Sequence, residues 1–216
     1  MAESYNLFSL SFDNVSMTAN NKLGDFFLTD EPGKGRHGSF NGLGIEYDRG
    51  FSISKKLPMF VEVGAKVSFT FYSKTFEEQS FSESEKYNLS MNLIRFNIPV
   101  SYAYRFKLNK KYSITPYAGL DLRFNLAANA KQKYEYFDRD DQSSSTTELS
   151  MNMFDEDDMG SYTFNRFQLG WHVGLRAEMN KFLLGLSCGT DFIPVMGYKG
   201  QNLNSFDLSL NLGVKF

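Results

Sequence analysis

His172 is the side chain best suited to acid–base chemistry, because an imidazole exchanges a proton near neutral pH. The only other histidine in the chain is His37. Neither histidine has a serine and a carboxylate at a spacing that singles out a catalytic triad. The sequence therefore favours a hydrogen-bonding role for His172 over a general-base role, and no catalytic residue is predicted.

Two further patterns could bind ligands. Residues 33–38 (GKGRHG) match the G-x-G-x-x-G pattern of phosphate-binding turns. That motif needs a preceding strand and a following helix, whereas these glycines lie inside a long connection, so we interpret them as a glycine-rich loop. Residues 155–158 (DEDD) could hold a divalent cation, but their spacing differs from that of a calcium loop. We predict no cofactor and no metal site.

Residues 127–161 form an acidic stretch that also carries aromatic side chains. Aromatic residues in an otherwise polar surface loop often mark contacts with other molecules. The candidate surface contacts are Tyr134, Tyr136, Phe137, Phe154, Asp155, Asp157 and Asp158. The length of the stretch predicts that its two flanking strands continue as a hairpin, which would include Met151 and Met153.

A second set of polar and charged residues alternates with apolar ones along strand-like segments. The two signs are nearly balanced in this set, which contains Glu46, Asp48, Glu62, Lys66, Arg95, Arg105, Asp121, Arg123, Arg166, His172, Arg176, Glu178, Asp191, Asp207 and Lys215. Unpaired charges inside a closed barrel would be strongly destabilising. The balance therefore predicts an ion-pair network that fills the interior.

The elements that position these side chains are eight segments of period-two alternation. They are residues 5–15, 40–54, 60–72, 94–106, 113–126, 162–179, 182–192 and 206–216. Short connections such as 55–59 alternate with long ones such as 16–39. This order places every short turn at one end of a barrel and every long loop at the other. The eighth segment should pair with the first, so that no sheet edge is left in the barrel.

Alternation alone does not say which face points into the barrel, so a membrane barrel and a soluble lipocalin-like barrel both fit. Glycines favour the membrane barrel, because they fall on the polar set, where a narrow lumen needs small residues beside large charged ones. These glycines are Gly44, Gly64, Gly119, Gly170, Gly174, Gly185, Gly189 and Gly213. The apolar set is nearly free of charge, as a lipid-facing surface requires.

Aromatic residues gather near the short turns, where they would form a girdle at the membrane interface. They are Tyr102, Tyr104, Phe106, Tyr112, Phe182 and Phe216. An eight-stranded barrel has an interior just wide enough for side chains, so we predict no open pore. Pro99 removes a ladder hydrogen bond within its segment, and a bulge is predicted there.

Composition excludes several classes. The net charge of −2 and the pI near 5.8 argue against a nucleic-acid-binding protein. The mean hydropathy of −0.37 suits a barrel, in which only alternate residues face lipid. The single cysteine, Cys188, excludes an intrachain disulfide. Strand-like sequence begins almost at once after Met1, so we expect that any export signal is already removed.

The regular strands, residues 114–120 (ITPYAGL) and the terminal Phe216 resemble small eight-stranded outer-membrane barrels of the OmpA/OmpX type. They are also similar to PorT-like outer membrane β-barrel domain proteins of Bacteroidota. The resemblance implies an all-β, antiparallel up-and-down barrel with short periplasmic turns and long extracellular loops. It also implies contact with outer-membrane lipid or lipopolysaccharide, and recognition of the strand ending at Phe216 by the barrel assembly machinery.

We therefore expect residues 1–216 to form a single, monomeric, non-enzymatic barrel in the bacterial outer membrane. Its expected role is structural or in surface recognition, with an extracellular ligand or protein at the long loops and no nucleic acid. The alternatives are a lipid-modifying outer-membrane enzyme, a soluble lipocalin-like carrier and a narrow passive channel. The enzyme would need one of the two histidines close to a serine and a carboxylate.

Overall fold

The computed structural model describes residues 4–24, 26–27, 35–54, 56–80, 83–139, 141–155 and 163–216. Its strands are β1 (Tyr5–Ala19), β2 (His37–Ser52), β3 (Met59–Gln79), β4 (Glu83–Tyr104), β5 (Phe106–Lys107), β6 (Tyr112–Asp138), β7 (Ser143–Asn152), β8 (Phe167–Met179), β9 (Phe182–Asp191), β10 (Met196–Tyr198) and β11 (Gln201–Lys215). Within the described ranges, no helix is long and apolar enough to cross a membrane.

Eight strands close into a ring. Neighbours pair in the order β1-β2-β3-β4-β6-β8-β9-β11, and β11 pairs back with β1. All of these pairs are antiparallel, and Leu10 lies opposite Leu212 at the closure. The eight-stranded antiparallel architecture predicted from alternation is confirmed, including closure by the first and last segments.

The ring is polar inside and apolar outside. On β1, Ser11 is 2% exposed while its neighbour Leu10 is 57% exposed, and Leu212 on β11 is 60% exposed. A water-soluble protein buries its large apolar side chains, so this inverted pattern requires an apolar solvent around the barrel. The predicted orientation of the two faces is confirmed on these strands.

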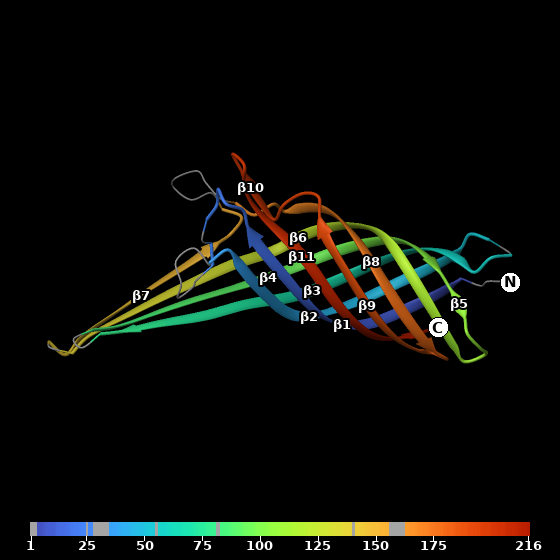
Figure 1. Cartoon of the computed structure of the whole chain (residues 1–216), viewed down its shortest axis with the longest axis horizontal. Helices are drawn as coiled ribbons and strands as arrows, with labels where there is room; N and C mark the ends of the chain where they lie inside the picture. The colour runs from blue at the N-terminus through green and yellow to red at the C-terminus, as the bar shows by residue number, and fades with distance from the viewer. Residues whose placement is uncertain are drawn as a thin grey trace.

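Three ring strands continue beyond the barrel. β3, β4 and β6 run on, and β7 joins β6, so that four strands form a protruding sheet that we call the extension (Figure 1). The β3–β4 pairing reaches Gln79↔Ser84, and the β6–β7 pairing reaches Asp138↔Ser143. β5 and the C-terminus lie at the opposite end of the molecule (Figure 1).

The predicted segments 60–72 and 94–106 were therefore too short at the loop end. Both faces of the extension are exposed to water, so the residues there do not alternate between apolar and polar. The predicted hairpin continuation is present as β6 and β7, but the returning strand ends at Asn152 and is separate from β8.

The bulge predicted at Pro99 is wrong. The β3–β4 register is the same before and after Pro99, at Val63↔Val100 and at Lys66↔Asn97. The two residue pairs between these positions are not paired in the ladder. Pro99 has no N–H to donate, and its ring is accommodated because Gly64 lies opposite, where an added Cβ would be 2.9 Å from Pro99 Cγ. The register shift lies instead between Ile94 and Arg95 on the β6 side of β4.

Candidate functional site

The interior of the barrel has three layers along its axis, and β1 contributes to all of them. Tyr5 and Leu7 belong to an apolar cluster at the turn end, which also contains Phe60, Ala103 and Leu183. The next inward-facing residues of β1, Ser9, Ser11 and Asp13, are buried in a polar layer. The loop end is filled by a larger apolar cluster of Val15, Met17, Ala19, Phe27, Phe40, Tyr72, Met91, Leu93, Ala128, Ala130, Met153, Phe164, Val195, Met196 and Leu203.

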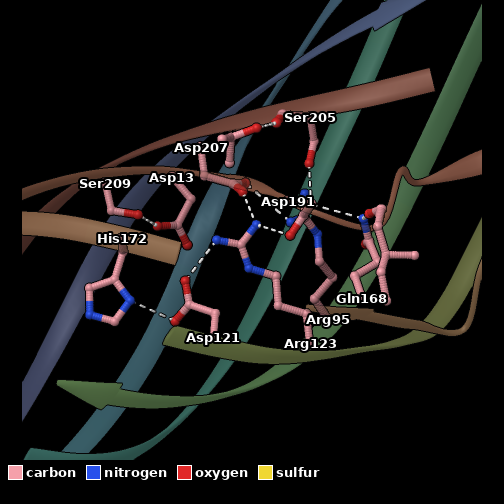
Figure 2. Close-up of polar contacts among 12 residues, drawn as sticks. Asp13, Arg95, Asp121, Arg123, Gln168, His172, Asp191, Ser205, Asp207 and Ser209 are labelled. Carbon is pink, nitrogen blue, oxygen red and sulfur yellow. Dashed lines mark hydrogen bonds and ion pairs between the residues drawn. The ribbon is translucent and has the colours of Figure 1, made fainter. Parts of the chain in front are cut away.

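Arg123 on β6 is the centre of the polar layer. Its guanidinium lies 2.8 Å from Asp121 and 2.8 Å from Asp191, and it also binds Asp207 (Figure 2). Arg95 from β4 binds the other oxygen of Asp207 at 3.1 Å. These strands carry the pairs because their inward-facing residues alternate with lipid-facing ones, so three ring strands deliver carboxylates to one buried cation.

A second cluster of charges lies toward the turn end. Glu178 accepts hydrogen bonds from Lys215 and from Thr115 Oγ1 (3.0 Å), and its carboxylate lies 3.3 Å from Arg105 Nε. Arg176 binds Glu62, which also accepts a hydrogen bond from the hydroxyl of Tyr5. Each of these carboxylates is therefore shared by at least two donors, as a buried charge requires.

The third cluster includes a residue that sequence reasoning missed. Asp13 forms a 2.7 Å ion pair with Lys66 and accepts a 2.6 Å hydrogen bond from Ser209 Oγ. Asp13 shares its face of β1 with Ser9 and Ser11, opposite to Phe8, Leu10 and Phe12, so alternation could have identified it.

His172 connects two partners on neighbouring strands. Its Nε2 lies 2.7 Å from Ser101 Oγ, and its Nδ1 lies 3.0 Å from Asp121 Oδ1. A carboxylate can only accept here, so Nδ1 carries the proton and the ring orientation matches that of a Ser-His-Asp triad. The spacing in the sequence does not reveal this arrangement. Ser101 on β4 and His172 on β8 both lie opposite Gly119 on β6, the strand between them, and the two side chains meet across that glycine.

The surroundings of this triad differ from those of a hydrolase. Ser101, His172 and Asp121 are 6%, 8% and 6% exposed, and Asp121 is also bound by Arg123. They line an internal cavity of about 90 Å³, which has room for a few water molecules but not for an acyl chain. Apolar clusters lie on both sides of the cavity along the axis.

Two of the carboxylates predicted for the lumen lack an ion-pair partner. Glu46 and Asp48 on β2 line the same cavity, but within the described residues no cation lies within ion-pair distance of either. Arg95 Nε and Arg176 Nε are buried nearby without a hydrogen-bond acceptor in the described part of the chain. Within the described residues, the ion pairs of the lumen therefore leave Glu46 and Asp48 uncompensated.

The assignment of Arg166 to the lumen is wrong. β8 begins one residue later, at Phe167, and the Arg166 side chain is exposed at the rim. Its guanidinium carbon lies 4.2 Å from the centre of the Phe154 ring. The predicted segment 162–179 began too early, since the irregular backbone before β8 ends the alternation that placed Arg166 inward.

The candidate surface contacts fall in and near the extension. The ring of Tyr134 packs against that of Tyr87 in a tilted arrangement, with ring centres 4.7 Å apart, and Phe137 is exposed near the end of β6. Partial desolvation and a hydrogen bond to Glu83 raise the pKa of Tyr136 to about 12. Asp155 accepts a 3.2 Å hydrogen bond from Asn152.

Asp157 and Asp158 lie outside the described residues, as do the first two residues of the 33–38 motif. His37 starts β2 and lies 3.0 Å from Thr18 Oγ1, away from the lumen triad. Within the described ranges, no group of three or more His, Cys, Asp or Glu side chains could hold a metal ion.

Several solved structures align with nearly the whole chain. Ail, the attachment invasion locus protein of Yersinia pestis, solved in complex with the heparin analogue sucrose octasulfate, is 13% identical with a TM-score of 0.36, covering 98% of this chain and 99% of Ail. Neisserial surface protein A (NspA) is 17% identical with a TM-score of 0.38, covering 97% of each chain. An outer membrane channel from Pseudomonas putida F1 is 7% identical with a TM-score of 0.34, covering 100% of this chain and 97% of the channel.

No curated protein matches the sequence. The family model of the outer membrane protein β-barrel domain matches residues 9–197, which begin within β1 and end within β10. The chain therefore belongs to the outer membrane protein β-barrel domain family and resides in the bacterial outer membrane.

Proposed function

We propose that this barrel is a non-enzymatic surface protein that presents its extension for recognition outside the cell. The observation that carries the proposal is the four-stranded sheet that β3, β4, β6 and β7 form beyond the ring. All ten residues of β7 are exposed, and within the described residues β7 pairs with β6 alone. The other edge of β7 has no strand partner among the described residues, so its backbone groups are a ready template for a binding partner.

The extension is built as an ordered platform. Rings from three adjacent strands contact one another, with Phe76–Tyr87 centres 6.3 Å apart and Tyr87–Tyr134 centres 4.7 Å apart. Ion pairs also cross between strands, as in Lys86–Glu77 at 2.7 Å. Cross-strand pairs of this kind stabilise a sheet, so the edge is held in place before a partner arrives, which lowers the entropy cost of binding.

The lumen supports a structural role rather than transport. A conducting pore needs a continuous wet path, whereas charge clusters and two apolar clusters occupy the interior. Lipid would contact the exposed apolar outer face, and we propose that β11, with Phe216 directly after it, is the segment read by the assembly machinery.

The test removes the extension and keeps the ring. Thr75 and Asn88 are register partners, and so are Gln132 and Leu149, so an Asn-Gly turn can close each hairpin at these positions. Wild-type and shortened barrels in vesicles would be compared for binding to panels of purified extracellular polysaccharides and matrix proteins. We expect at least one ligand to bind the wild type and to be lost from the shortened barrel, with heat-modifiable migration on gels retained. Equal binding by the two barrels, or no binding by either, would contradict the proposal.

A hydrolase is the second candidate, because Ser101, His172 and Asp121 have triad geometry. The test is labelling of the folded barrel with a fluorophosphonate, which reacts with activated serines. We expect no labelling, since a cavity of about 90 Å³ is too small to admit a substrate. Labelling that disappears in Ser101→Ala would instead establish an activated serine and would overturn the non-enzymatic assignment.

A further inference from the structure

We propose that the turn end of the barrel binds the phosphate headgroups of anionic phospholipids in the periplasm-facing leaflet. The binding groups form what we call the lysine collar, which consists of Lys56, Lys107, Lys110, Lys111 and Lys181. They come from the β2–β3 turn, from β5 and the turn that follows it, and from the β8–β9 turn. Together they line a basin of about 1080 Å³ at the mouth of the barrel.

The charge of the lysine collar is not neutralised by the protein. All five side chains are exposed, and within the described ranges none has a carboxylate at ion-pair distance. The nearby acids Glu62 and Glu178 are buried and already bind Arg176, Arg105 and Lys215. Like charges gathered in one basin repel one another, so an external anion is favoured there.

Three lysines at the other end of the molecule are paired with carboxylates. In the extension, Lys86 pairs with Glu77 at 2.7 Å, and Lys131 pairs with Glu148 at 3.0 Å. Lys133 pairs with Glu135. Lys74 of β3 has no ion pair among the described residues, so the control for the collar is the set of three paired lysines.

The neighbours of the collar point to lipid rather than to a soluble anion. Large exposed apolar side chains flank the lysines in the chain: Leu57 follows Lys56, Phe106 and Leu108 flank Lys107, Tyr112 follows Lys111, and Phe182 follows Lys181. Leu108 and Phe182 are 63% and 64% exposed. Such residues anchor barrels at the interface. A lysine one position away can extend its flexible stem along apolar surface and place its ammonium group at the phosphate level.

The expected preference is for net negative headgroups. Attraction to an anionic membrane surface favours binding by about fivefold for each lysine near the surface. Salt screens this attraction because the Debye length falls to about 3 Å at 1 M ionic strength. A zwitterionic lipid offers the same phosphate beside a compensating ammonium, so it should compete poorly for the collar.

The experiment places a fluorescent reporter beside the collar. The chain has one tryptophan, so Trp171→Phe combined with Phe182→Trp moves the signal next to Lys181. The barrel is reconstituted in phosphatidylcholine vesicles that contain brominated phosphatidylglycerol, and quenching reports the relative affinity of the two lipids. The collar variant is Lys107→Gln, Lys110→Gln, Lys111→Gln. The matched control is Lys86→Gln, Lys131→Gln, Lys133→Gln, which removes the same charge from the extension.

We expect the reporter protein and the control to prefer phosphatidylglycerol by at least about fivefold. The collar variant keeps Lys56 and Lys181, so its preference should be reduced by at least about fivefold. In 1 M salt the preference of every protein should disappear. Native mass spectrometry of phosphatidylglycerol bound to the barrel without the reporter substitutions should show the same reduction in the collar variant. A preference near one in the reporter protein, or equal preference in the collar variant, would overturn the proposal. Binding of an octaglutamate peptide to barrels in pure phosphatidylcholine, without a lipid preference, would assign the collar to an acidic protein instead.

Discussion

Replacement of Arg123 by glutamine tests whether the lumen charges stabilise the barrel. The Arg123 side chain is 4% exposed, and its partners Asp121, Asp191 and Asp207 have side chains that are 9%, 1% and 17% exposed. Removing one partner of a buried ion pair typically costs about 3–5 kcal/mol. That cost is not multiplied by three, because Asp207 retains Arg95 at 3.1 Å and Asp121 retains His172 at 3.0 Å.

The loss should therefore come mainly from Asp191, which keeps only its hydrogen bonds from Gln168 and Ser205. We expect Arg123→Gln to lower the free energy of unfolding by about 3–5 kcal/mol, a large share of the about 5–15 kcal/mol that stabilises a typical domain. The assay is urea unfolding in phosphatidylcholine vesicles, followed by the fluorescence of Trp171.

Adding Asp191→Asn to Arg123→Gln should restore part of the loss, since the second change removes the uncompensated charge. Lys86→Gln, at an exposed ion pair of the extension, serves as the control and should unfold like the wild type. The reasoning would be refuted if Arg123→Gln unfolded within about 1 kcal/mol of the wild type, well below the expected cost of a broken buried pair. In that case water in the cavity, and not Arg123, would compensate the carboxylates.

Three further predictions use other parts of the molecule. Gly119→Ala should destabilise the barrel by about 1–3 kcal/mol in the same urea assay, because an added Cβ would lie 2.1 Å from the carbonyl oxygen of Val100. Gly185→Ala is the control that should be tolerated, because a Cβ added there would lie 3.4 Å from the nearest atom. Hydrogen bonds from Lys133 and Lys131 lower the pKa values of Glu135 and Glu148 from 4.5. The stability that these ion pairs give to the extension is complete above pH 4.5 and is lost as the pH falls through the lowered pKa values. Hydrogen-exchange protection of β7 should therefore fall at pH 3.5 more than that of β9. Wild-type protein in a planar bilayer should show no steady conductance, and open-channel currents that survive in the variant without the extension would contradict a filled lumen.

The ring could be predicted because alternation in a closed barrel reports directly which side chains face the lumen. Asp207 and Lys215 lie on the polar face of β11 as alternation placed them, and the structure brings Asp207 to Arg123 and Lys215 to Glu178. The extension could not be outlined fully, because both of its faces are wet and its residues carry no single period. Arg166 was misplaced because the start of β8 depends on the packing of the loop before it, which no local pattern encodes.

The triad geometry shows a different limit. Ser101, Asp121 and His172 are separated by 20 and 51 positions, and they meet only because Gly119 aligns Ser101 with His172 across β6. That register depends on the shift between Ile94 and Arg95 on the β4–β6 pair. A one-residue change in register would turn the side chains of one strand to the other face, so the contact is not determined by any one segment.

The lumen and the extension are mechanically one unit, because they share strands. β6 runs without interruption for 27 residues, from Tyr112 to Asp138, which corresponds to about 90 Å at about 3.3 Å per residue. Asp121 and Arg123 fix this strand inside the barrel, and Tyr134 packs on Tyr87 in the extension. β4 likewise carries Arg95 in the lumen and Tyr87 in the extension. The buried ion pairs therefore do more than fill space: they hold the base of the strands whose far ends form the exposed platform, so loosening the lumen should also loosen the recognition edge.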